Sequence, residues 1–196
     1  AVGRHARLEL LEEELPQLAG ELAVLGTDRV AISWIDPQDL ERPHEAVARV
    51  EAAANAAAAA GLRLGFHNHW SELRPLDEGR TFLDLLRELP PELLWLELDL
   101  GWVWHAGADP TSELAKTRGR CPLVHVERKP NADAVVAPTA GHGSLVVERA
   151  LQVLHSTSGC LLVVDHVLLF CHAGRRNALV PLSVVLPPLP SGDPAA

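Results

Sequence analysis

Residues 61–73 of the chain read GLRLGFHNHWSEL, an apolar run that ends abruptly in polar residues. The apolar part, Leu62–Phe66, predicts a short buried strand. Four side chains that bind protons, metals or hydroxyl groups follow the strand directly: His67, Asn68, His69 and Glu72. This arrangement indicates that the strand delivers functional groups from its carboxyl end.

The same unit of strand, polar loop and helix recurs along the chain. Further strands are predicted at residues 29–34, 93–100, 122–126 and 160–164, so each unit takes about 30 residues. Leucine spacing predicts a helix from Ala6 to Leu25 that Pro16 interrupts. Other helices are predicted at residues 44–60, which Gly61 caps, at 80–89, at 144–156, and from Pro110 to Thr117 behind an Asp109 cap. Alternating strands and helices predict a parallel sheet with right-handed crossovers.

Two α/β folds fit this order of elements, a (β/α)8 TIM barrel and an open doubly wound parallel sheet. The nucleotide signatures typical of open sheets, GxGxxG and GxxxxGK[ST], follow none of the predicted strands. Polar groups at successive strand ends favour the barrel. A complete barrel takes about 250 residues, whereas the 196 residues here supply about five βα units. We therefore expect a partial barrel over residues 1–170 and a Pro-rich, irregular or disordered tail over residues 171–196.

Composition limits the classes of partner. The formal net charge is −9, from 26 acidic and 17 basic residues, and such a surface repels nucleic acid. No apolar run reaches the roughly 20 residues of a membrane span, and the first residues carry no signal-peptide pattern. The three cysteines lack metal-binding spacing and fit a reducing compartment. We expect a cytoplasmic protein whose partner is a small molecule, with neither nucleic acid nor membrane bound.

Polar residues end the other predicted strands as well. Asp99 ends the strand at 93–100, His125 lies in the strand at 122–126, and Asp165 follows the strand at 160–164. Each has a structural alternative, because a lone strand histidine is often a hydrogen-bonded core residue and Asp99 could cap a loop. Together they predict one rim of carboxylates and imidazoles, which suits Mn²⁺, Co²⁺, Mg²⁺ or Zn²⁺. Such a cation polarises a carbonyl, and a neighbouring base then moves a proton between adjacent carbons.

Three segments resemble the sugar phosphate isomerase/epimerase family, which are xylose isomerase-like TIM barrels. The segments are GLRLGFHNHWSEL, LELDLGWVWHAGADP (residues 96–110) and GRCPLVHVERKP (119–130), and the likeness runs from about His5 to about Val167. Family motifs are met by His67-Asn68-His69 with Glu72, by Glu97-Leu98-Asp99 with Trp102, and by His125. The resemblance also implies that the chain lacks the first two βα units and nearly all of the third strand, of which His5 is the last trace.

The resemblance implies roles for individual residues. Glu72, Asp99, His125 and Asp165 would be the metal ligands, with His67 as the alternative to Glu72 as first ligand. Glu72, Asp165 and His67 would be catalytic, and the substrate would contact His69, Asn68, Trp102 and Lys129. Two departures from the family pattern stand out: Asp165 replaces a glutamate, and Glu127-Arg128 replace a lysine and an aspartate.

The function expected from these features is a metal-dependent isomerase or epimerase in carbohydrate metabolism, acting on a sugar or sugar phosphate through a metal-stabilised enediolate. A dehydratase of a cyclic keto-polyol, of the inosose or dehydroshikimate type, is the nearest alternative. An incomplete barrel without activity and an endonuclease IV-like hydrolase are the others, and the acidic charge argues against the hydrolase. For the missing strands, the alternatives are truncation, exchange with a second copy in a homodimer, and an inactive remnant.

Overall fold

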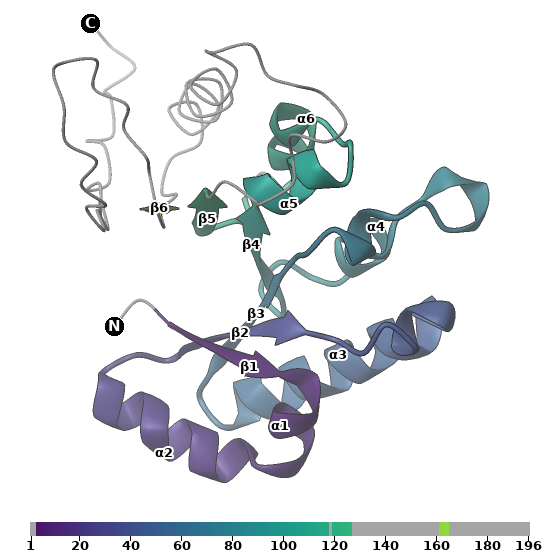
Figure 1. Cartoon of the computed structure of the whole chain (residues 1–196). Helices are drawn as coiled ribbons and strands as arrows, with labels where there is room; N and C mark the ends of the chain where they lie inside the picture. The colour runs from purple at the N-terminus through teal and green to yellow at the C-terminus, as the bar shows by residue number, and fades with distance from the viewer. Residues whose placement is uncertain (1–2, 118, 127–160, 165–196) are drawn as a thin grey trace, which may run out of the picture.

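The computed structural model describes residues 3–117, 119–126 and 161–164. Its strands are β1 (Arg4–Arg7), β2 (Arg29–Trp34), β3 (Arg63–His67), β4 (Trp95–Asp99), β5 (Leu123–Val126) and β6 (Leu161–Val164). They form one parallel sheet in the order β1-β2-β3-β4-β5-β6 (Figure 1). A doubly wound sheet reverses its strand order at a switch point. The order of the described strands contains no reversal, so the barrel expectation is confirmed as a partial barrel.

The helices lie along one face of this sheet (Figure 1). They are α1 (Leu8–Glu13), α2 (Leu15–Leu25), α3 (Pro43–Ala59), α4 (Phe82–Leu86), α5 (Leu100–His105) and α6 (Pro110–Lys116). Short 3₁₀ turns occupy Asp39–Glu41, Ser71–Leu73 and Asp77–Gly79. Among the described residues, no helix is long and apolar enough to cross a membrane.

The two faces of the sheet bury different kinds of residue, because side chains alternate along a strand. Val30, Leu64, Leu96 and Val124 belong to the large core that the strands share with the helices. Their neighbours along the strands point to the other face, which is the inner face of the partial barrel. There a small apolar cluster of Ala31, Trp95 and Leu123 fills the part near the amino ends of the strands. The carboxyl ends of the same face are polar.

Gly65 makes room for the largest side chain of that inner face. A Cβ atom at residue 65 would lie 2.4 Å from the Trp95 indole ring, closer than non-bonded carbon atoms approach. The indole Nε1 donates a hydrogen bond to the Arg63 carbonyl, 3.2 Å away. The absence of a side chain at Gly65 therefore allows the Trp95 indole on β4 to pack against β3.

The beginning of the chain corrects the predicted helix at Ala6–Leu25. Arg4–Arg7 forms a strand that pairs with β2, so the third-strand equivalent is more complete than the sequence suggested. The leucine pattern that favours a helix begins only at Leu8. As predicted, the helix is then interrupted before Pro16, with non-helical dihedrals at Glu14.

The strand predicted at residues 93–100 is wrong at its carboxyl end, because β4 ends at Asp99. Leu100, predicted as strand, begins α5, because the Asp99 side chain caps the helix by accepting a hydrogen bond from the Trp102 N–H. The strand predicted at 29–34 and the helix that Asp109 and Pro110 begin are confirmed. The helix predicted at 144–156 and the tail predicted at 171–196 lie outside the described residues, so the division at residue 170 stays a prediction.

Candidate metal and substrate site at the carboxyl ends of the strands

Two carboxylates point to the inner face from one strand. Glu97 and Asp99 are two residues apart on β4, so their side chains share a face. Their exposed fractions are 6 % and 0 %. Moving a carboxylate out of water costs several kcal/mol unless a cation or hydrogen-bond donors compensate. The pair therefore marks a position where positive charge or donors must converge.

Imidazoles from the neighbouring strands surround these carboxylates. His67 on β3 is in register with Glu97, and His125 on β5 is in register with Asp99. The His125 Nδ1 atom lies 3.2 Å from Asp99 Oδ2, and the His67 Nε2 atom lies 3.8 Å from the same oxygen. Consecutive parallel strands thus bring together three residues that are far apart in the sequence.

Hydrogen bonds to its backbone and to its Oδ1 atom hold Asp99 in place. Its Oδ1 atom accepts the hydrogen bond from the Trp102 N–H at 3.0 Å, which caps α5. The Asn68 side chain accepts a hydrogen bond from the Asp99 N–H at 2.9 Å and donates one to the Asp99 carbonyl at 3.3 Å. These contacts leave Oδ2 directed at the imidazoles of His67 and His125.

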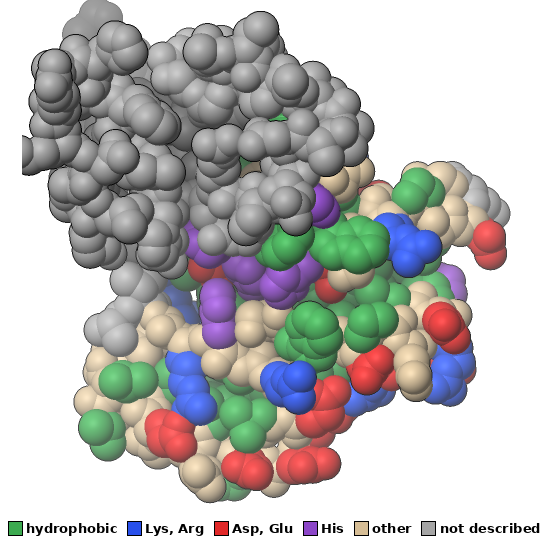
Figure 2. All heavy atoms as spheres, in the orientation of Figure 1, with side chains coloured by type: hydrophobic (Ala, Val, Ile, Leu, Met, Phe, Trp, Pro, Cys, Tyr) green, Lys and Arg blue, Asp and Glu red, His purple; other side chains and the backbone are tan. Residues whose placement is uncertain are grey.

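A second group lies on the other side of His67. The His5 Nε2 atom on β1 lies 2.7 Å from Glu97 Oε2, and His67 Nδ1 lies 3.7 Å from the same oxygen. The rings of His5 and His67 are 4.7 Å apart. Figure 2 shows several histidine side chains gathered at the centre of the face viewed, and another that lies apart at the right edge.

The donors in these two groups suit a divalent cation. One ligand atom from each of His67, Asp99 and His125 lies within 4.8 Å of the others, and the same is true of His5, His67 and Glu97. Burial, followed by the nearby His5, lowers the pKa of His67 to about 3, although Asp99 acts in the opposite direction. His67 is therefore neutral at neutral pH and keeps a lone pair. Its buried Nδ1 atom makes no hydrogen bond with the described residues.

The residues proposed from the sequence are divided between this site and its surroundings. Glu72 is buried, but its Oε2 atom accepts a hydrogen bond from the His69 N–H at 2.8 Å, and it belongs to neither group of the described ligand atoms. Asn68 is 1 % exposed and braces Asp99. Asp165 and Lys129 lie outside the described residues.

A row of ring contacts continues from His67, whose ring centroid is 5.2 Å from that of His69. The His69 ring contacts both Trp34 and Trp102, with ring centroids 6.1 and 5.5 Å away. His105 continues the row from Trp102, at 5.3 Å. Trp34 is 43 % exposed. Sequence reasoning proposed His69 and Trp102 but missed Trp34, although it ends a predicted strand.

Sequence reasoning also assigned no ligand role to Glu97. The available signal was its spacing from Asp99, because residues two apart on a strand share a face. His5 was noted only as the trace of a strand, and its contact with Glu97 joins residues that are 92 positions apart in the sequence.

Solved structures show the same fold. Two sugar phosphate isomerase/epimerases from Parabacteroides distasonis match with TM-scores of 0.53 and 0.56 at 17 and 18 % identity, covering 63 and 74 % of this chain and 52 and 55 % of theirs. The probable 3-DHS dehydratase AsbF of Bacillus anthracis, involved in petrobactin synthesis, matches with a TM-score of 0.51 at 21 % identity, covering 70 % of this chain and 54 % of its own. A scan of family models and a search of curated proteins gave no match.

These matches confirm the resemblance at the level of the fold. The chain has the architecture of the xylose isomerase-like TIM barrels and spans about half the length of these solved isomerase/epimerases. Both isomerase/epimerases and a dehydratase occur among the structures with this fold. The reaction and the substrate of this chain are therefore matters for proposal.

Proposed function

We propose that the chain is a metal-dependent isomerase or epimerase that acts on a sugar or sugar phosphate. The observation that carries this proposal is the convergence of His67, Asp99 and His125, with their ligand atoms within 4.8 Å of one another. Within this group, the Asp99 carboxylate and the His125 imidazole are donors that Mn²⁺, Co²⁺ or Zn²⁺ accepts, and open positions remain for other ligands.

A bound cation would supply Lewis acidity that polarises a carbonyl group of the substrate. Asp99 and His125 would hold it, with Asp99 oriented by Asn68 and by the first turn of α5. A base with a pKa of about 3 is weak at neutral pH, so we do not assign proton transfer to His67. Proton transfer then falls to a carboxylate, and Asp165 and Glu72 remain the proposed residues.

Substrate binding is assigned to the aromatic row beside the ligands. The indole rings of Trp34 and Trp102 flank His69 and offer apolar faces to the C–H side of a sugar ring. Imidazole nitrogens of His69 and His105 add hydrogen-bonding groups for hydroxyls. Lys129, which the sequence suggests for an anionic group, completes the proposed set.

Proton transfer itself provides the test. The protein loaded with Co²⁺ or Mn²⁺ is incubated in D₂O with a panel of keto- and aldo-sugars and their phosphates, and deuterium incorporation next to the carbonyl is followed by NMR. We expect incorporation into at least one compound and at least a 100-fold lower rate in His125→Ala. His44→Ala, which changes an exposed helix residue, serves as the matched control.

Absence of cation uptake at neutral pH, together with no deuterium incorporation, would contradict the proposal and leave the incomplete barrel without activity. The dehydratase alternative gives a different result in the same samples. Elimination of water from a keto-polyol produces a conjugated carbonyl, which absorbs in the ultraviolet.

A further inference from the structure

The two ring nitrogens of His67 face two different carboxylates. Nε2 lies 3.8 Å from Asp99 Oδ2, whereas Nδ1 lies 3.7 Å from Glu97 Oε2. The His67 side chain is 5 % exposed. One imidazole therefore separates two acidic positions at the centre of the site.

A neutral imidazole has one N–H and one lone pair, so its two nitrogens perform different tasks here. Histidines that bind metals usually donate the second ring N–H to a carboxylate. With the hydrogen on Nε2, His67 turns its N–H toward Asp99 Oδ2, which at 3.8 Å is beyond hydrogen-bond distance, and keeps its lone pair on Nδ1. Nδ1 is also the buried atom that makes no hydrogen bond with the described residues.

Two further donors lie around that lone pair. The His5 Nε2 atom and Glu97 Oε2 are 2.7 Å apart, and one ligand atom from each of His5, His67 and Glu97 lies within 4.8 Å of the others. The Glu97 side chain is 8 % exposed, and that of His5 is 45 % exposed. His67 on β3 and Glu97 on β4 are therefore buried, whereas His5 on β1 is accessible to solvent.

We propose that His5, His67 and Glu97 form a second divalent-cation position, beside the one at Asp99 and His125. Two nitrogen ligands and one carboxylate suit Zn²⁺ or Co²⁺, with an open position for water or a substrate oxygen. The 2.7 Å contact with Glu97 Oε2 needs the hydrogen of His5 on Nε2. When His5 binds a cation through Nε2, this hydrogen moves to Nδ1, and no proton is lost from either ring. The position draws on β1, β3 and β4, and the existence of a second cation does not depend on turnover.

The test is the number of cations bound. The protein is freed of metal with a chelator and titrated with Co²⁺, and calorimetry, visible absorbance and metal analysis after desalting give the stoichiometry. We expect two equivalents for the wild type and for His44→Ala. His5→Ala and Glu97→Gln should each bind one equivalent, and His125→Ala should lose the other equivalent.

Far-ultraviolet circular dichroism shows whether each variant folds. Glu97→Gln keeps the size of a buried side chain, and His5→Ala changes a half-exposed residue of an outer described strand, so at least His5→Ala remains informative if the other fails to fold. A single equivalent in the wild type that both variants retain overturns the second position. Failure of the proposed function has a different signature, namely no deuterium incorporation whatever the number of cations bound.

Discussion

Asp99 shows how one side chain serves both the fold and the site. Its Oδ1 atom caps α5, and its Oδ2 atom faces His125 at 3.2 Å and His67 at 3.8 Å. The two readings that the sequence left open, capping residue and metal ligand, are therefore compatible. Asn68 strengthens the arrangement because it fixes the Asp99 backbone from both sides of the peptide.

At Gly65 the structure makes a sharp prediction about stability. Gly65→Ala places a Cβ atom 2.4 Å from the Trp95 ring, so β3 and β4 must separate or the indole must leave its position. We expect a loss of about 1–3 kcal/mol in the free energy of unfolding, as for other overpacked cores. Chemical denaturation of both proteins measures the difference.

Gly20→Ala is the matched control for that substitution. Gly20 lies in α2, and a Cβ atom there meets no atom within 4 Å. Alanine is favoured over glycine inside a helix by about 1 kcal/mol, so this variant should be at least as stable as the wild type. Equal destabilisation by the two substitutions would contradict the role assigned to Trp95.

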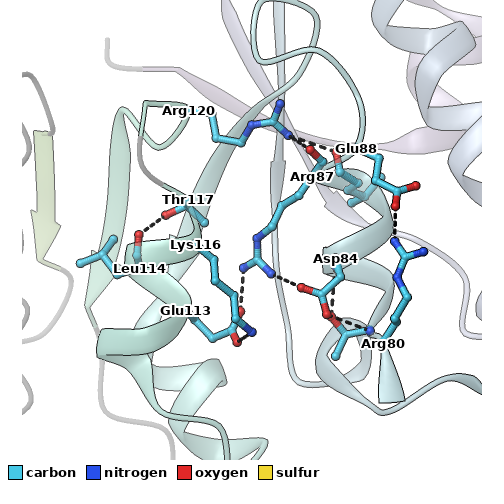
Figure 3. Close-up of polar contacts among 11 residues, drawn as sticks. Arg80, Asp84, Arg87, Glu88, Glu113, Leu114, Lys116, Thr117 and Arg120 are labelled. Carbon is cyan, nitrogen blue, oxygen red and sulfur yellow. Dashed lines mark hydrogen bonds and ion pairs between the residues drawn. The ribbon is translucent and has the colours of Figure 1, made fainter. Parts of the chain in front are cut away.

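At the scale of elements, the buried Arg120 and the partly buried Arg87 connect α4 with the elements that follow it (Figure 3). Arg120 donates hydrogen bonds to the carbonyls of Leu86, Arg87 and Leu89 at the end of α4. Arg87 pairs with Asp84 on α4 and with Glu113 on α6. The helix C-terminus thus finds its missing donors in a side chain that lies just before β5.

Arg120→Met should destabilise the chain because it leaves those buried carbonyls without donors. Burial lowers the pKa of Arg120 from its ordinary value, but a guanidinium stays charged, and its loss should cost about 1–3 kcal/mol. Thermal unfolding followed by circular dichroism measures the change. Arg80→Met is the matched control, because Arg80 pairs with Glu88 at the surface and such pairs contribute about 0–1 kcal/mol.

At the scale of the whole molecule, the consecutive strand order determines where the site lies. Every described strand runs in the same direction, so the carboxyl ends of β1, β3, β4 and β5 meet at one edge. Residues from these four strands supply the candidate ligands. A sugar or polyol substrate and a homodimer stay predictions at this scale.

Cation binding should therefore stabilise the whole sheet. At free Co²⁺ 100-fold above its Kd, stabilisation of about 2.7 kcal/mol is expected, which raises Tm by roughly 5–10 °C for a chain of this size. EDTA should reverse the rise, and differential scanning calorimetry measures both. His67→Ala, which removes the residue common to both groups, should lose most of it, whereas an undiminished rise in that variant would argue against cation binding at these residues.

Local patterns in the sequence were sufficient to predict most elements. The strand at 29–34 was predicted correctly to the residue. The start of α6 was also correct, because the Asp109 cap and Pro110 are local signals. The strand Arg4–Arg7 could not be predicted, because four residues carry too little periodicity and their extended form depends on pairing with β2. The start of α5 was missed because the apolar run continues from strand into helix.

By itself the sequence indicated the class of fold and the residue types at the strand ends, since both are patterns of residues that are close together in the chain. Only the tertiary structure decided which of these residues meet. Glu72 lies three residues after His69 and accepts a hydrogen bond from its N–H, and it belongs to neither described group of ligand atoms. Glu97 and His5, 92 positions apart, come within 2.7 Å. Register between strands is set by packing over the entire sheet, and no segment encodes it alone.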